Sequence, residues 1–216
     1  MGQALLQTEP YVSPEDYLAA EAEADTRHEY VDGHILAMAG ASEAHNLVKD
    51  NLRSELHRRL RGQGCRVTTS DQRVKAGTSY RYPDVVMHCG EGTFSGEHPP
   101  MLLNPELLVE VVSVSTAEAD RIDKLTEYTE LESLQEYWIA EQDRALVTQY
   151  VRHGADWRVR FVRGLDASLQ SEHFGVEIPM ADLYALVDLP VPPTPPTGTP
   201  SQTSATPGSE PDAEAS

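Results

Sequence analysis

The sequence predicts an α/β or α+β fold in which helices pack against a β-sheet. Two observations predict it: amphipathic segments of helical length alternate with short apolar runs of strand length, and the elements come in a characteristic order. A helix is followed by several strands, a second helix and further strands. This order is typical of a sheet with helices packed against it.

The N-terminal elements carry start and turn signals. Ser13 is typical of a helix N-cap and Pro14 of the first helical position, so a short helix is expected from here to about Asp25. Asp32-Gly33 then separates two strand-like runs, at residues 27–31 and 34–38. This pair of runs predicts a β-hairpin.

A long amphipathic helix is expected over residues 42–61, and its buried stripe recurs every four residues, at Val48, Leu52, Leu56 and Leu60. Further strands and a second helix follow: strands at 65–69, 72–75, 82–87 and 107–113, the helix over 116–132, and strands at 136–140, 145–151 and 157–162. Residues 189–216 are rich in Pro, Thr, Ser and Gly and are expected to form a disordered, acidic tail. Residues 1–188 are therefore expected to form one folded domain.

The charge of the chain limits its partners. The 216 residues carry a formal net charge of -18, and the tail contributes only three acids and no base, so the remainder carries -15. Such a surface repels polyanions at long range, whereas proteins that bind nucleic acid through bulk electrostatics are basic. Either a nucleic-acid substrate is bound in a local basic groove, with a metal ion neutralising phosphate charge, or the substrate is something else.

The remaining composition indicates a cytoplasmic protein. No apolar run approaches the roughly 18 residues of a membrane span, and the N-terminus lacks a basic region followed by an apolar one. Cys65 and Cys89 form neither a metal motif nor a disulfide framework. We expect them to be small, partly buried core residues.

Glu110 interrupts the apolar run Leu107–Val112, which otherwise has the composition of a strand buried on both faces. An isolated ionised carboxylate at such a position is costly unless it is paired or bound to a metal. We interpret Glu110 as a functional acid. A buried salt bridge or a strand-end acid is the alternative.

Asp84 follows Pro83, which cannot donate a hydrogen bond to a sheet and tends to lie where a strand begins. Alone, Asp84 is equally typical of a turn cap, but together with Glu110 it forms a pair of carboxylates on neighbouring strands. Mg²⁺ prefers octahedral oxygen ligands, keeps several waters and needs only one or two protein carboxylates. The pair therefore predicts a site for Mg²⁺, or for Mn²⁺ in its place.

Lys124 shares a helix face with Asp120 and Tyr128, because residues four apart lie on the same side of a helix. The spacing alone is equally compatible with an exposed Asp–Lys ion pair. The helix follows directly from the strand of Glu110, so its early turns can lie over the end of that strand. This position favours a functional Lys124.

Two further positions allow alternative assignments. Ser115 begins a match to the helix capping box that Glu118 completes, so Ser115 and Thr116 are interpreted as a cap and not as nucleophiles.

His45 lies on the apolar stripe of the long helix and should point inward. It is either a core histidine hydrogen-bonded to backbone or a residue that contacts phosphate or transfers a proton. Glu29, before the hairpin turn, is a further candidate of this kind.

Taken together in chain order, these residues resemble the Uma-two family of restriction-endonuclease-like nucleases, within the PD-(D/E)XK superfamily. The resemblance covers roughly residues 10–162, and no single motif is specific. It rests on these segments: Glu29–Gly33, the His45 helix, Tyr82–Val85, Glu110–Thr116, Asp120 with Lys124 and Tyr128, and Glu136–Trp138. It implies a restriction-endonuclease-like mixed β-sheet flanked by helices, and a Mg²⁺-dependent endonuclease that hydrolyses phosphodiester bonds of nucleic acid, DNA in the first instance.

The superfamily pattern also implies roles for single residues. Asp84 and Glu110, with the carbonyl of Val111, would bind Mg²⁺. The pattern has a lysine two residues after the glutamate, where this chain has Val112, and strand residues two apart share a face. The resemblance implies that Lys124 takes the place of that lysine and positions the attacking water.

The resemblance favours the functional interpretation of His45 and leaves a second class of function open. Val112 and the acidic surface are compatible with a catalytically degenerate member that binds nucleic acid or protein without cleaving it. Lys124 and an aromatic fraction of only 6% disfavour a glycosidase pair of carboxylates, because sugar sites usually carry stacking rings. The expected partner is a nucleic-acid substrate and no membrane, with a homodimer as a compatible assembly.

Overall fold

The structure, a computed structural model, describes residues 10–38, 40–97, 99–113 and 118–190, and only the backbone of 118–121. At its centre is a six-stranded sheet whose neighbouring strands are, in order, β10 (Asp156–Arg163), β9 (Leu146–His153), β8 (Glu136–Glu141), β7 (Leu107–Val112), β6 (Val85–Cys89) and β3 (Cys65–Thr69). Strands β7 and β8 run parallel, and the other neighbouring pairs are antiparallel. The predicted fold class, a mixed sheet flanked by helices, is confirmed.

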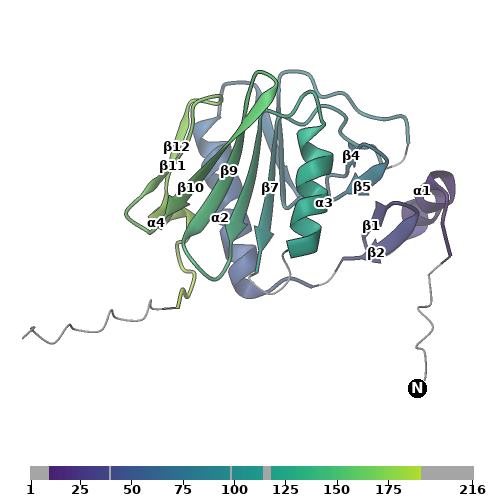
Figure 1. Cartoon of the computed structure of the whole chain (residues 1–216), viewed down its shortest axis with the longest axis horizontal. Helices are drawn as coiled ribbons and strands as arrows, with labels where there is room; N and C mark the ends of the chain where they lie inside the picture. Colours follow the sequence, from purple (N-terminus) through teal and green to yellow (C-terminus); the bar gives the residue numbers. More distant parts are fainter. Residues whose placement is uncertain (1–9, 39, 98, 114–117, 191–216) are drawn as a thin grey trace, which may run out of the picture.

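Two helices cover opposite faces of this sheet (Figure 1). Helix α2 (Glu43–Arg59) begins after Ser42, whose side chain accepts a hydrogen bond from the backbone N–H of His45. Helix α3 (Glu118–Thr129) connects the parallel strands β7 and β8, as a crossover between parallel strands requires. The predicted cap of α3 at Ser115 and Thr116 lies outside the described residues.

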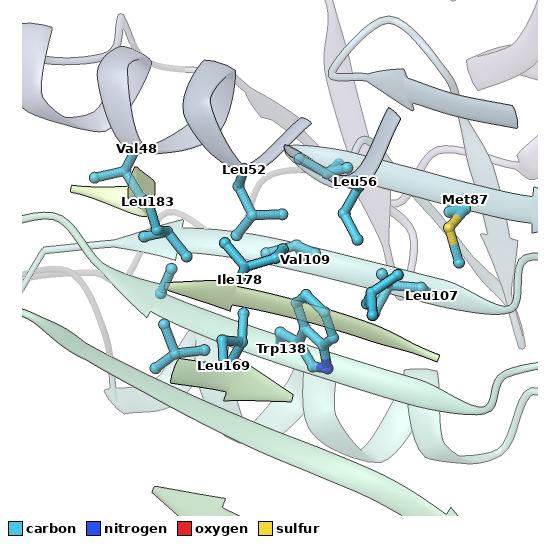
Figure 2. Close-up of a cluster of buried hydrophobic side chains, with 14 of the residues drawn as sticks. Val48, Leu52, Leu56, Met87, Leu107, Val109, Trp138, Leu169, Ile178 and Leu183 are labelled. Atoms are coloured by element: carbon cyan, nitrogen blue, oxygen red, sulfur yellow. The ribbon is translucent and has the colours of Figure 1, made fainter. Parts of the chain in front are cut away.

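The larger hydrophobic core lies between α2 and the sheet (Figure 2). The stripe predicted from the sequence is buried: Val48, Leu52 and Leu56 are 0% exposed and Leu60 is 2% exposed. Burying each of these leucines stabilises the fold by roughly 1.5–3 kcal/mol relative to leaving it exposed. The helix is thereby held firmly against the sheet, and the residues at its N-terminal end are positioned with it.

Alternation along β7 determines which way Glu110 faces. Val109 and Val111 belong to the core under α2. Leu108 belongs to a second core on the other face, together with Tyr128 of α3. Because successive strand residues point to opposite faces, Glu110 lies on the side covered by α3.

The N-terminal part forms a smaller unit beside α3 (Figure 1). After α1 (Pro14–Glu23) comes a four-stranded sheet in the order β2 (His34–Ala37), β1 (His28–Val31), β5 (Ser79–Arg81) and β4 (Val74–Ala76). The predicted hairpin turn is confirmed: Asp32 and Gly33 have φ of 47° and 87°. A Cβ on Gly33 would lie 2.1 Å from the ring of Tyr11, so this position requires glycine.

Several short elements were not predicted from the sequence. They are β5 and, near the C-terminus, β11 (Ser168–Ser171), β12 (Val176–Pro179) and α4 (Met180–Leu183). Leu169, Ile178 and Leu183 of the C-terminal elements complete the core under α2. Runs of three or four residues are too short to show a clear hydrophobic period, which explains why they were missed. Within the described ranges, no helix is long and apolar enough to cross a membrane.

The expectation of two unpaired cysteines was wrong. Cys65 and Cys89 are half-buried against the core under α2, but they form a disulfide. They occupy directly opposite positions in the antiparallel pair β3–β6. The pairing depends on this strand register, which the sequence separation of 24 residues does not reveal.

Candidate active site

The start of β6 and the end of β7 bring the two predicted acids together. Val85 pairs with Val109 in the antiparallel register, so Asp84, one residue before Val85, lies next to Glu110, one residue after Val109. The carboxylate of Asp84 is held at both oxygens. The N–H of Val111 donates to Oδ2 at 2.8 Å, and the ring Nε2 of His45 lies 2.9 Å from Oδ1.

His45 reaches Asp84 from the first turn of α2. The side chain is half-buried and points inward, as its position on the apolar stripe predicted. Its partner is a carboxylate and not the backbone carbonyl expected for a core histidine. His45 therefore orients Asp84, while its contact with phosphate stays a prediction.

Glu110 is the most strongly perturbed acid of the site. It is 6% exposed, Tyr128 Oη donates to its Oε1 at 2.9 Å, and Lys124 Nζ lies 3.2 Å from its Oε2. Burial raises the pKa of Glu110 to about 8, with further increases from the charges of Asp84 and Glu29. Lys124 and the Tyr128 hydroxyl act in the opposite direction and do not outweigh them.

Helix α3 contributes a lysine and a tyrosine to the site. Lys124 and Tyr128 lie one turn apart on α3, and both contact Glu110. Lys124 is 8% exposed, and its Nζ also lies 3.7 Å from Glu29 Oε1. The structure thus brings Lys124 to the predicted acids; the side chain of Asp120 lies outside the part of the chain that the structure describes.

Val112 occupies the strand position where the superfamily pattern has its lysine. It is half-buried and packs against the core that contains Tyr128. Its carbonyl accepts a hydrogen bond from Gln142 on the β8 side, whereas the N–H of Val111 points to Asp84 on the β6 side. Because the backbone groups of successive residues face opposite edges of a strand, the Val111 carbonyl faces the edge of Asp84.

A buried charge network behind Lys124 was not predicted. Arg81, 1% exposed, donates to Glu29 Oε2 at 3.0 Å and to both oxygens of Glu127 at 2.8 and 2.9 Å. Glu29 also accepts the N–H of Tyr82 at 3.1 Å. The network joins β1, β5 and α3. The sequence signal for Arg81 was its place three residues before Asp84, but β5 was not recognised as a strand.

The predicted acids and Lys124 line a pocket of about 670 Å³. Its polar lining includes Glu29, His45, Lys49, Asp84, Glu110 and Lys124, and its apolar lining includes Leu36, Met38 and Val112. The pocket therefore holds three carboxylates, two lysines and a histidine next to an apolar wall. Such a convergence of polar groups in a concavity is typical of a ligand-binding or catalytic site.

Comparison with solved structures supports the fold. The crystal structure of a chain from Anabaena variabilis, described as a "putative nuclease belonging to DUF820", matches with a TM-score of 0.65 and 15% sequence identity. The match covers 80% of this chain and 97% of that chain. The two chains therefore share one α+β architecture, a mixed sheet flanked by helices.

Comparison of sequences shows the family. The family model Uma2, described as "Putative restriction endonuclease", matches residues 14–181, and the chain belongs to this family. Two relatives from Synechocystis sp. are similar: the uncharacterized protein sll1609 is 30% identical over 169 residues, covering 77% of this chain and 96% of the relative. The uncharacterized protein slr1290 is 29% identical over 178 residues, covering 81% of this chain and 92% of the relative.

Proposed function

We propose that this chain is a Mg²⁺-dependent endonuclease that hydrolyses phosphodiester bonds of nucleic acid, DNA in the first instance. One observation carries the proposal: Lys124 Nζ lies 3.2 Å from Glu110 Oε2, although Lys124 comes from α3 and not from β7. A fixed cation beside two carboxylates at the floor of a pocket is suited to holding an attacking water and to stabilising charge on a phosphate. Membership of the Uma2 family supports the same class of reaction.

The donor set fits a hard divalent cation. Within the residues that the structure describes, each carboxylate oxygen of Asp84 and Glu110 has one partner at hydrogen-bond or ion-pair distance, and a carboxylate oxygen has about two lone-pair sites. Among the described residues, no group of three or more His, Cys, Asp or Glu side chains is arranged for a metal ion. Asp84, Glu110 and the Val111 carbonyl would hold Mg²⁺, because this ion needs only one or two protein carboxylates and keeps several waters.

When bound, the cation would supply Lewis-acid polarisation of the scissile phosphate and lower the pKa of a nearby water. The chain's own groups perform the positioning. His45 and the Val111 N–H hold Asp84, and Tyr128 holds Glu110. Lys124 orients the attacking water.

A nuclease assay with isosteric variants tests the proposal. We expect purified wild-type protein to cleave DNA with Mg²⁺ or Mn²⁺ and not with EDTA, and Glu110→Gln to abolish this cleavage. Glu172→Gln is the matched control, because the Glu172 side chain is 78% exposed and lies outside the pocket. Unchanged DNA cleavage by Glu110→Gln would sink the assignment.

The alternative is a degenerate member that binds nucleic acid or protein without cleaving it. Val112 favours this alternative, because it leaves the usual lysine position on β7 apolar. Isothermal titration with Mg²⁺ or Mn²⁺ discriminates the two. A scaffold without catalytic function has no reason to bind metal through Asp84 and Glu110, so metal binding that is lost in Glu110→Gln supports the enzyme.

A further inference from the structure

The pocket has an apolar lip on the side of the N-terminal hairpin. Leu36 of β2 and Met38 just after it line the pocket and are 46% and 40% exposed. Residues two apart on an extended segment point to the same side, so the two side chains lie next to each other. β2 is an edge strand, paired on one side with β1. The lip therefore presents two large, accessible apolar side chains at the edge of the smaller sheet.

The acids lie deep relative to this lip. Asp84 is 8% exposed and Glu110 6%, so a phosphodiester must enter the pocket to reach them. A volume of about 670 Å³ is in the size range of small-ligand sites. Duplex DNA is stiff over about 150 base pairs. A flexible single strand can bring a phosphodiester into such a pocket without the cost of bending a stiff duplex.

The charge of the protein points in the same direction. With a net charge of -18, the chain gains little from long-range attraction to a phosphate backbone. Recognition of nucleic acid then depends on local charges, such as those of Lys49 and Lys124 in the pocket, and on contacts that carry no charge. Packing of a base against apolar side chains is such a contact, because the hydrophobic effect does not depend on charge.

We propose that the pocket takes an unpaired segment of nucleic acid, with a base packed against Leu36 and Met38 while its phosphate lies on the floor at Asp84 and Glu110. The inference rests on the proposed nuclease function and names its substrate class: single strands, frayed ends and flaps, in preference to intact duplex. Packing against the face of a base needs no particular hydrogen bond, so we expect this contact to tolerate any sequence.

Binding of labelled strands tests the inference separately from cleavage. The probe is a short fluorescein-labelled oligothymidylate, measured by fluorescence anisotropy with Ca²⁺ in place of Mg²⁺. Wild-type protein is expected to bind it at least about tenfold more tightly than the same strand annealed to oligodeoxyadenylate. The double variant Leu36→Ala/Met38→Ala is expected to lose about tenfold on the single strand and nothing on the duplex. Leu165→Ala is the matched control, because Leu165 is a leucine of similar exposure, 49%, outside the pocket.

A strand of abasic residues completes the design. If a base packs on the lip, the abasic strand binds wild type and the double variant equally. Equal binding of single strand and duplex by wild type would overturn the inference, as would a double variant that keeps its single-strand affinity. A double variant that only changes the oligomeric state in light scattering shows that the lip is a contact between copies, and also overturns it.

The two proposals fail in different ways. Wild-type protein that binds single strands through the lip but cleaves nothing with Mg²⁺ contradicts the nuclease function and leaves the binding inference standing. Wild-type protein that cleaves intact duplex, with Leu36→Ala/Met38→Ala equally active on duplex and single strand, supports the nuclease function and overturns the inference about its substrate.

Discussion

Replacing Glu110 with Gln should change how the stability of the metal-free protein depends on pH. The pKa of Glu110 is raised from 4.5 to about 8 in the folded protein, mainly by burial. Between these two values the folded state holds a proton on Glu110 that the unfolded state has released. Stability from this group is therefore complete below pH 4.5 and falls as the pH rises towards 8. The amide that replaces the carboxyl group does not titrate in this range, so the variant has no such dependence.

The size of the effect follows from one proton. A difference of one bound proton changes the free energy of unfolding by about 1.4 kcal/mol per pH unit. From pH 5 to pH 8 the difference accumulates to roughly 3 kcal/mol, which is an upper value because water penetration reduces it. Relative to wild type, Glu110→Gln should thus become progressively more stable across this window.

Urea unfolding in EDTA at several pH values from 5 to 8 measures this difference. Glu172→Gln serves as the control, because its glutamate is exposed and should give a curve parallel to wild type. Curves for wild type and Glu110→Gln that also run parallel would show that Glu110 is ionised throughout. The account of a buried, proton-holding acid beside Asp84 would then be refuted.

Three further predictions concern the same site and the core that supports it. Mg²⁺ binding near pH 7 should release about one proton, because the proton on Glu110 must leave before the carboxylate binds a cation. Titration calorimetry in buffers of different ionisation enthalpy measures the number of protons released, and a number near zero contradicts the prediction. Tyr128→Phe removes a hydrogen bond that lowers the pKa of Glu110, so the pH at which Mg²⁺ binding is half-maximal should rise by about one unit. An unchanged or lower pH would show that the hydrogen bond does not stabilise the carboxylate. Leu52→Ala should lower the free energy of unfolding by about 2–5 kcal/mol in denaturant titration, whereas Leu165→Ala should stay within about 0.5 kcal/mol, and equal effects would place Leu52 outside the core.

The parts of the fold that could be predicted from the sequence have a long hydrophobic period or a clear turn signal. The stripe from Val48 to Leu60 and the turn at Asp32-Gly33 are local signals, and the structure confirms both. The disulfide between Cys65 and Cys89 depends on the register of two strands, and register is a tertiary property. The short strands β11 and β12 also depend on tertiary structure, because they pair with each other and pack into the core under α2.

The site divides in the same way. Glu110 was predicted because an acid in an apolar strand is conspicuous, and Asp84 because it pairs with Glu110. Lys124 was predicted because its helix follows the strand of Glu110 and because of the resemblance to a family. Their distances could not be predicted, because they depend on how α3 lies over β7. Arg81 was missed altogether, since its importance comes from Glu29 and Glu127, which lie 52 and 46 residues away along the chain.

The cleavage rate of Lys124→Ala shows whether a helix-borne lysine performs the task of the lysine that Val112 replaces. The measurement is single-turnover cleavage of single-stranded DNA at saturating Mg²⁺, with Lys75→Ala as a control at an exposed lysine of β4 outside the pocket. The account predicts that wild type and Lys75→Ala cleave at equal rates, and that Lys124→Ala still binds Mg²⁺ but cleaves on the order of a hundredfold more slowly. Cleavage by Lys124→Ala at the wild-type rate, or no cleavage by wild type, would contradict it.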